Sequence, residues 1–225
     1  MSDEKTQWLE RLQERVEAQE ADPEWQAKRA EELAHLEARR KARVLRELEA
    51  IDVPVKDVAL IKAGNLLETE AFAAVSLTDW KLLALSGGAG TGKTTAASCW
   101  LWSAVDAAIR DDFTGGRPPM LFLTAARLSR WPKYDDEQMR RVLKAHRLVI
   151  DDLGAEYVDK NGSYLSLLDE VVNERYANRR ATLLTTNLEV GPFKERYGER
   201  IADRIREIGR FVSVGNKSMR RKDAA

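Results

Sequence analysis

The stretch that most constrains the fold of this chain is SGGAGTGKTT, residues 86–95, which fits the pattern G-x-x-x-x-G-K-[ST] with Gly87, Gly92, Lys93 and Thr94. It follows a predicted strand and opens a predicted helix, which is the context that this pattern requires. Glycines let successive backbone N–H groups turn toward one anion without Cβ clashes, and a helix that begins there directs its positive end at the same anion. The stretch therefore predicts a cradle for phosphate groups.

The residue types of this cradle indicate a nucleoside triphosphate and Mg²⁺ as cofactors. Lys93 is expected to neutralise the β and γ oxygens, and the Thr94 hydroxyl is expected to ligate Mg²⁺. No guanine-selecting N-K-x-D string is evident, which favours ATP over GTP. The predicted nucleotide contacts are Gly87, Gly88, Gly90, Thr91, Gly92, Lys93, Thr94 and Thr95.

From about residue 51 onward, short apolar runs alternate with segments of helical pattern. The runs are KLLALSG (81–87), MLFLTA (120–125), RLVIDD (147–152), ATLLTTN (181–187) and RFVSVG (210–215). Apolar runs separated by helices are typical of βαβ units with a buried parallel sheet. The sequence therefore predicts an α/β domain with a five-stranded parallel sheet flanked by helices.

Polar side chains stand where two of these strands end, at the edge of the sheet that carries the cradle. In LVIDDLGAE, Asp151 is expected to hold the Mg²⁺ coordination shell, and Asp152 to polarise the attacking water. Because an aspartate reaches one methylene less than glutamate, we expect hydrolysis that is slow or needs a partner. Asp152 could instead cap the following turn, and Glu156 is a weaker candidate for polarising the water. Asn187, at the end of LLTTNLE, is expected to align a water on the γ-phosphate, unless it only forms a turn.

A third segment, GERIADRIREIGR at residues 198–210, reads as an amphipathic helix with four arginines in thirteen residues. Its isoleucines face inward, which leaves Arg200 and Arg204 on a neighbouring face where they can project beyond the domain. We hypothesise that Arg204 reaches the γ-phosphate held by the next copy of the protein, as an arginine finger. Arg200 and Arg206 are expected to form salt bridges. Taken alone, the helix could simply carry surface charge.

Charge composition restricts how the chain could bind nucleic acid. Lysines and arginines equal aspartates and glutamates at 37 each, so no global field attracts a polyanion, and contacts with DNA must be local. One stretch combines cations with aromatic residues, and the C-terminal tail carries cations alone, so both are candidates for DNA contacts. The candidates are Arg127, Arg130, Trp131, Lys133 and Tyr134 in RLSRWPKY, and Lys217, Arg220, Arg221 and Lys222 in the tail.

The number of cysteines and the hydropathy of the chain indicate the cellular compartment in which the protein resides. Cys99 is the single cysteine, so no intramolecular disulfide can form, and no Cys/His cluster suggests zinc. No run of about 18 apolar residues occurs, and the N-terminus lacks the apolar stretch of a signal peptide. We therefore expect a cytoplasmic protein.

The first 50 residues differ in amino-acid composition from the remainder of the chain. Nearly half of residues 3–50 are charged, with both signs interleaved, and Pro23 follows Asp22 in a way that starts a second helix. This region reads either as a solvated helical arm or as a docking arm for a partner protein, with Trp8 and Trp25 as anchors. The sequence leaves both interpretations open.

Together, GGAGTGKTT, LVIDDLGAE, LLTTNL and GERIADRIRE resemble, in order and spacing, the motifs of AAA+ ATPases. The resemblance is to DnaC-type replicative helicase loaders and to IstB-type transposition helpers, and it covers roughly residues 51–216. It implies an ATP-dependent assembly factor that forms a ring or spiral, binds single-stranded DNA and helps place a ring-shaped replicative helicase on it. By position, Lys93 and Thr94 take the nucleotide role, Asp151 and Asp152 form the acidic pair, Asn187 is the first sensor and Arg204 is the finger.

The same resemblance gives a division of the chain. We expect a helical partner-docking arm over residues 1–50, the AAA+ domain over 51–216 and a basic tail over 217–225, with no C-terminal lid domain after RFVSVGNKSMRRK. One departure lies in the arm, because zinc-carrying members of the loader group have cysteine ligands there and this chain has none.

Other functions compete with helicase loading. A transposition helper would use the same machine on a different protein partner. A P-loop small-molecule kinase would need a mobile arginine-bearing lid, and GGRPPM is too short for one. A non-hydrolysing adaptor, in which ATP only fixes a conformation, stays open because of Asp152.

Overall fold

The computed structural model describes residues 2–77, 80–111, 119–131, 136–156, 162–215 and 218, with side chains from residue 5 onward. The chain divides into two compact units, Met1–Arg43 and Val44–Ala225. None of the helices in these described ranges is long and apolar enough to cross a bilayer.

The first unit consists of helix α1 (Ser2–Ala21) and most of helix α2 (Pro23–Ala50). The break between them lies where the sequence predicts it, since the Asp22 carboxylate accepts a hydrogen bond of 2.9 Å from the backbone N–H of Glu24. Large apolar side chains in this unit remain exposed, including Trp8 at 61% and Leu36 at 58%. The unit therefore has no core of its own among its described side chains.

The second unit begins inside α2, because Val44 and Leu48 near the end of that helix are buried in its core. It contains five strands, β1 (Leu82–Ser86), β2 (Met120–Thr124), β3 (Arg147–Leu153), β4 (Ala181–Thr186) and β5 (Gly209–Ser213). Its further described helices are α3 (Val55–Ala63), α4 (Glu70–Ser76), α5 (Lys93–Arg110), α6 (Ala125–Leu128), α7 (Asp136–Lys144), α8 (Ser163–Ala177), α9 (Val190–Tyr197) and α10 (Glu199–Ile208).

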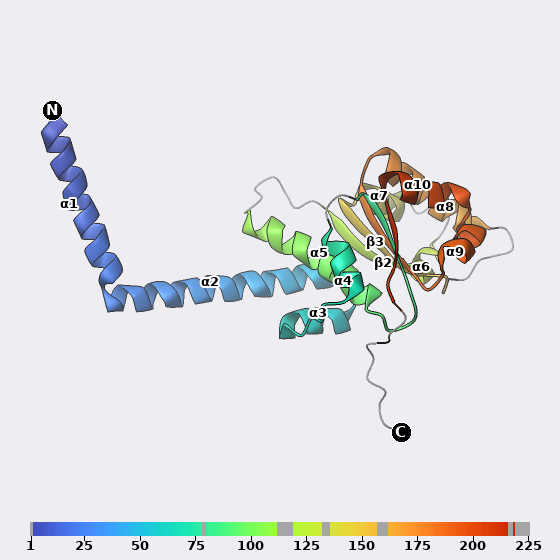
Figure 1. Ribbon diagram of the computed structural model, residues 1–225, viewed down its shortest axis with the longest axis horizontal. Coiled ribbons are helices and arrows are strands. Elements are labelled where there is room, and N and C mark those ends of the chain that lie inside the picture. Colours follow the sequence, from blue (N-terminus) through green and yellow to red (C-terminus); the bar gives the residue numbers. More distant parts are fainter. Residues whose placement is uncertain are drawn as a thin grey trace, which may run out of the picture. The chain divides into compact units, whose positions relative to one another are not determined.

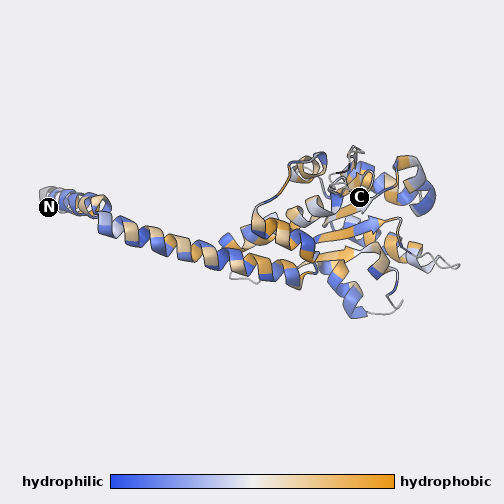
Figure 2. Ribbon diagram, turned by 90° about the horizontal axis from the view of Figure 1, so that it is seen from below, coloured by the Kyte–Doolittle hydropathy of each residue, from blue (hydrophilic) through white to orange (hydrophobic). Residues whose placement is uncertain are grey.

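All neighbouring strands pair in parallel, in the order β2-β3-β4-β1-β5, so the predicted five-stranded parallel sheet is confirmed. Alternate residues of each strand enter different cores because successive side chains of a strand point to opposite faces. Leu83 and Leu85 pack with the end of α2, α3, α4 and α5, whereas Leu82 and Ala84 pack with α6 to α10. Figure 1 shows the strands between these helices, and Figure 2 shows that apolar residues gather on the strands.

The strand order positions the candidate site. In the sheet, β2 to β4 lie on one side of β1, and β5 lies on its other side, so the strand order changes direction at β1. In parallel sheets of this kind, ligands bind outside the carboxyl ends of the strands at such a point. Gly87 follows β1, Asp151 and Asp152 lie in the last residues of β3, and Asn187 follows β4. The topology therefore brings the three predicted motifs to one edge of the sheet.

Candidate functional site

The predicted cradle is a tight loop between β1 and α5. Gly90 and Gly92 have φ angles of 83° and 86°, a left-handed conformation that glycine adopts without the strain of a Cβ atom. Gly92 is the residue before α5, so the loop delivers the chain directly into the first turn of that helix. A cavity of about 700 Å³ opens beside the loop, within the range of small-molecule sites. Residues 89–96, the ends of β3 and β4, and parts of α3 and α4 line it.

Lys93 connects the cradle to the end of β4. Its Nζ donates hydrogen bonds to the backbone oxygens of Gly87 and Gly88 at 2.7 and 2.9 Å, and to Asn187 Oδ1 at 3.0 Å. Lys93 is only 8% exposed, and burial lowers the pKa of its ammonium against the opposing attraction of Asp151 and Asp152. A phosphate group beside this ammonium would stabilise its charged form.

The Thr94 hydroxyl and the Asp151 carboxylate form the second element of the site. Thr94 Oγ1 donates to both carboxylate oxygens at 3.1 and 3.2 Å, and Thr185 Oγ1 from β4 donates to Asp151 Oδ1 at 2.6 Å. Asp151 is 6% exposed, and burial raises the pKa of its carboxyl group despite these two donors. A hydroxyl and a carboxylate in contact are the oxygen ligands that Mg²⁺ prefers, so the residues fit the predicted cation.

Asp152 lies at a bulge in β3. The pairing of β3 with β4 shifts between Ile150 and Leu153, and Asp152 has a φ angle of 61°, which aspartate tolerates better than most residues. Its backbone N–H donates to Thr185 Oγ1 at 2.9 Å. The bulge leaves the Asp152 side chain exposed at the cavity, next to the buried Asp151.

Glu156 is the first sequence candidate that the structure overturns. Its buried carboxylate accepts hydrogen bonds from Arg196 at 3.0 Å, from the Tyr197 hydroxyl at 2.7 Å and from the backbone N–H of Gly154 at 2.7 Å. It does not line the cavity. Glu156 therefore joins the end of β3 to α9 and is not placed to polarise a water.

Arg204 is held differently from the expectation. The isoleucines of α10 face inward as predicted, but Arg204 does not project, since its side chain is only 14% exposed. It lies 3.3 Å from Asp169 Oδ1, donates to Asn173 Oδ1 and stands 5.4 Å over the Tyr176 ring. The reason is that α10 packs on α8, which supplies these three partners.

The other arginines of α10 form ion pairs. Arg200 pairs with Asp169 at 2.5 Å, and Arg206 with Asp203 at 2.9 Å, as expected for salt-bridge residues. Arg204 does not line the cavity of the subunit to which it belongs. If it contacts a phosphate, that phosphate must therefore be bound in the cavity of another copy of the protein.

The hydroxyl groups of two cradle threonines donate hydrogen bonds to oxygen atoms of the protein itself. Thr91 Oγ1 donates to the backbone oxygen of Gly88 at 3.0 Å, and Thr95 Oγ1 donates to the Asp57 carboxylate at 2.8 Å. Asp57 and its neighbour Lys56 line the same cavity from α3, a contribution that the sequence patterns did not indicate.

The predicted DNA contacts are only partly within the described residues. Arg127 forms an ion pair of 2.9 Å with Asp52, and Trp131 is half-buried against the core that includes α6 to α10. Lys133, Tyr134 and the tail candidates Lys217, Arg220, Arg221 and Lys222 lie outside the described residues.

Replacing Asp151 with asparagine is expected to raise the melting temperature at neutral pH. Because burial raises the pKa of Asp151, its charged form costs stability in the folded state, and the amide removes that cost. The gain should shrink as the pH falls through the raised pKa, where the wild-type carboxyl is protonated. Thermal unfolding of the two proteins over a pH series, with the exposed Asp203→Asn as control, measures this. A lower melting temperature for Asp151→Asn at neutral pH would contradict it.

Comparison with known proteins agrees with the geometry of the site. Residues 5–225 match the model of a family described as IstB-like ATP binding protein. A curated relative, the uncharacterized protein YdaV of Escherichia coli (strain K12), is 29% identical over 163 residues, which cover 69% of this chain. The match spans 61% of that relative's own length.

Two solved structures share the fold. A crystal structure of the DnaC helicase loader has 25% identity and a TM-score of 0.50, over 64% of this chain and 85% of that chain. The replication initiator DnaA bound to AMPPCP and single-stranded DNA has 14% identity and a TM-score of 0.50, over 67% of this chain and 48% of that chain. The second likeness concerns the fold alone.

Proposed function

Because the chain belongs to the IstB-like ATP-binding family and has the AAA+ fold, we propose that it is an ATP-dependent helicase loader. In this proposal an oligomer of the protein binds single-stranded DNA and helps place a replicative ring helicase on it. The observation that carries the proposal is the convergence of Lys93, the Thr94–Asp151 pair and Asn187 at one sheet edge. The likeness to the DnaC helicase loader supports the choice of partner.

The cradle performs the first part of the proposed reaction by binding and orienting ATP. Lys93 and the N–H groups at the start of α5 bind the outer phosphates. Thr94 and Asp151 would hold Mg²⁺, which supplies positive charge to the β and γ oxygens when bound. Asn187, already in contact with Lys93, orients the attacking water, and the exposed Asp152 accepts its proton. The short reach of Asp152 makes hydrolysis slow until a partner closes the site.

Assembly supplies the remaining charge in this proposal. Arg204 exchanges its contacts with Asp169 and Asn173 for the γ-phosphate held by a neighbouring copy. A carboxylate partner in the free subunit keeps the guanidinium ordered and satisfied until that exchange. Hydrolysis therefore depends on contact between copies.

The parts of the chain have separate tasks in the proposal. The arm before Val44 binds the helicase through exposed apolar side chains such as Trp8, and the unit from Val44 to residue 216 forms the ATPase. The basic tail over 217–225, with Arg130 and Trp131, binds single-stranded DNA without reading its sequence.

Two alternatives each have an observation in their favour. The description of the matching family favours an IstB-type transposition helper, in which the same ATPase acts on a transposase. The aspartate at position 152 favours a non-hydrolysing adaptor, in which ATP only fixes a conformation. A single-turnover assay with saturating DNA separates the adaptor, because it would release no phosphate.

The partner is tested by complex formation between the full chain and a purified replicative ring helicase, with and without ATP and single-stranded DNA. We expect co-elution of the two proteins with ATP, and loss of the helicase when Trp8 and Trp25 are both replaced by alanine. The matched control is Lys62→Ala, which changes an exposed lysine of α3 outside the cavity and leaves both the arm and the ATP site intact. Absence of any complex with the helicase, under conditions where a transposase is retained, would favour the transposition helper.

A further inference from the structure

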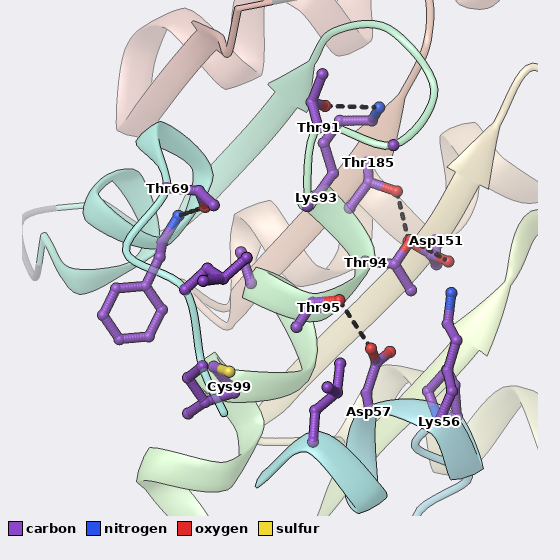
Figure 3. A pocket seen from close by; sticks show the side chains of 18 of the residues that line it. Lys56, Asp57, Thr69, Thr91, Lys93, Thr94, Thr95, Cys99, Asp151 and Thr185 are labelled. Carbon is purple, nitrogen blue, oxygen red and sulfur yellow. Dashed lines mark hydrogen bonds between the residues drawn. The ribbon is translucent and has the colours of Figure 1, made fainter. Parts of the chain in front are cut away.

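A second lysine reaches the cavity from outside the predicted motifs. Lys56 lies in the first turn of α3 and lines the cavity together with the cradle residues. It is exposed, and within the described ranges no carboxylate lies at ion-pair distance from its ammonium group. Figure 3 shows its side chain extending from α3 on the side of α5 where Asp151 lies. This cation is therefore available to a ligand in the cavity.

The neighbouring residue, Asp57, fixes the place of Lys56. The Asp57 carboxylate is fully buried and accepts hydrogen bonds from Thr95 Oγ1 at 2.8 Å and from Ser98 Oγ at 3.1 Å. Both donors belong to α5, the helix that begins at the cradle. Asp57 thus ties the first turn of α3 to the phosphate-binding end of α5, so the backbone of Lys56 has a set position relative to the cradle.

The charges that line the cavity indicate why a second lysine would help to bind a triphosphate. Among the described residues, the acidic and basic side chains that line the cavity are those of Asp57, Asp151, Asp152, Lys93 and Lys56. Lys93 already lies close to two of these carboxylates, which attract its charge. A triphosphate brings several further negative charges, so one lysine leaves a large excess of like charge in a partly buried space. An exposed ammonium on the Asp151 side of α5 would offset that excess beside the phosphates whose cation Thr94 and Asp151 would hold.

We propose that Lys56 binds the terminal phosphate of ATP in the same subunit that holds the nucleotide. This inference rests on the proposed ATP site and adds a cation that no motif of the cradle supplies. Because Lys56 stands on α3, ATP and ADP would differ in whether they contact this helix. Lys56 would thereby discriminate between the two nucleotide states from within the subunit, independently of Arg204.

The test measures equilibrium binding of ATP and ADP, with fluorescent analogues of each, to Lys56→Ala and Lys56→Glu. We expect Kd for ATP to rise about 5–10-fold in Lys56→Ala and further in Lys56→Glu, while Kd for ADP changes less than about twofold. Lys62→Ala is the matched control, because Lys62 is an exposed lysine of the same helix that does not line the cavity. Lys56→Arg should retain the preference for ATP.

The outcomes separate this inference from the proposed function. If Lys56→Ala binds ATP as Lys62→Ala does, or loses ATP and ADP equally, Lys56 does not read the terminal phosphate. Lys93→Ala in the same assay reports on the cradle itself. Loss of binding in Lys93→Ala with none in Lys56→Ala leaves the ATP site standing and overturns only the role of Lys56. Unchanged binding in Lys93→Ala would overturn the site.

Discussion

Replacing Lys93 with alanine is expected to weaken ATP binding about 100-fold, which corresponds to about 2.7 kcal/mol. The Lys93 ammonium is nearly buried and surrounded by the oxygens of Gly87, Gly88 and Asn187, so its charge acts in a poorly solvated space. Hydrogen bonds from such a cation to phosphate are each worth about 1.5–3 kcal/mol. The variant also removes an ammonium that attracts Asp151 and Asp152, which increases their repulsion of the phosphates.

Titration calorimetry with ATP in the presence of Mg²⁺ measures this loss. The fold should survive, because burial lowers the pKa of Lys93 and shows that its charge costs stability in the free protein. Circular dichroism of the variant should therefore match the wild type, and Lys62→Ala should bind ATP normally. An ATP affinity within threefold of wild type in Lys93→Ala would show that the cradle is not the nucleotide site.

Replacing Arg204 with alanine is expected to lower the ATPase rate about 1,000-fold while ATP affinity in the free subunit stays the same. The two effects separate because Arg204 does not line the cavity of its own subunit and would act only on the nucleotide of a neighbour. Removing its contacts with Asp169 and Asn173 should cost about 1 kcal/mol of folding stability, since the side chain is only 14% exposed. Arg204→Lys should not restore the rate, because an ammonium lacks the planar fork of donors.

The control for this prediction is Arg200→Ala, which removes the other arginine that contacts Asp169. Arg200 is exposed and forms a surface ion pair, so its loss should change the ATPase rate little. Steady-state phosphate release, measured over a range of protein concentrations, gives both rates. If Arg200→Ala and Arg204→Ala lose activity equally, the helix acts through its fold or its charge, and the specific role of Arg204 fails.

The strands and the cradle could be predicted because their signals are local. Apolar runs bounded by helical segments specify β1 to β5, and the spacing from Gly87 to Thr94 specifies the loop that joins β1 to α5. The meeting of Asp151 and Asn187 with this loop follows from one rule, that parallel strands end at the same edge of a sheet. Once the five strands are known to be parallel, it follows that these residues lie close together.

Residues whose surroundings are set by tertiary packing could not be predicted. Arg175 follows the charged Glu174 near the end of α8, yet it is 1% exposed, and its guanidinium donates to the backbone oxygens of Val142, Ala145 and Ala181. Glu156 follows the acidic pair in the sequence, but Arg196 and Tyr197 of α9 take its carboxylate away from the cavity. No periodicity or spacing shows which helix will pack against a given side chain.

The same limit explains Arg204 and the contribution of α3. Helical periodicity gives the face on which Arg204 lies, but only the packing of α10 on α8 brings it to Asp169. Likewise, residues 51–69 carry no phosphate-binding pattern, and Lys56 and Asp57 line the cavity because α3 packs on α5. Both features become visible only when the helices are assembled on the sheet.

We propose above all that ATP held by one subunit is acted on by Arg204 of the next. The most direct test of this proposal is the ATPase rate of Lys93→Ala and Arg204→Ala subunits, each inactive alone, after mixing at equal concentration. An intact cradle in one variant can then meet an intact Arg204 in the other, so we expect activity to reappear on mixing and to rise with total protein concentration. A mixture no more active than the sum of its separate components would contradict it.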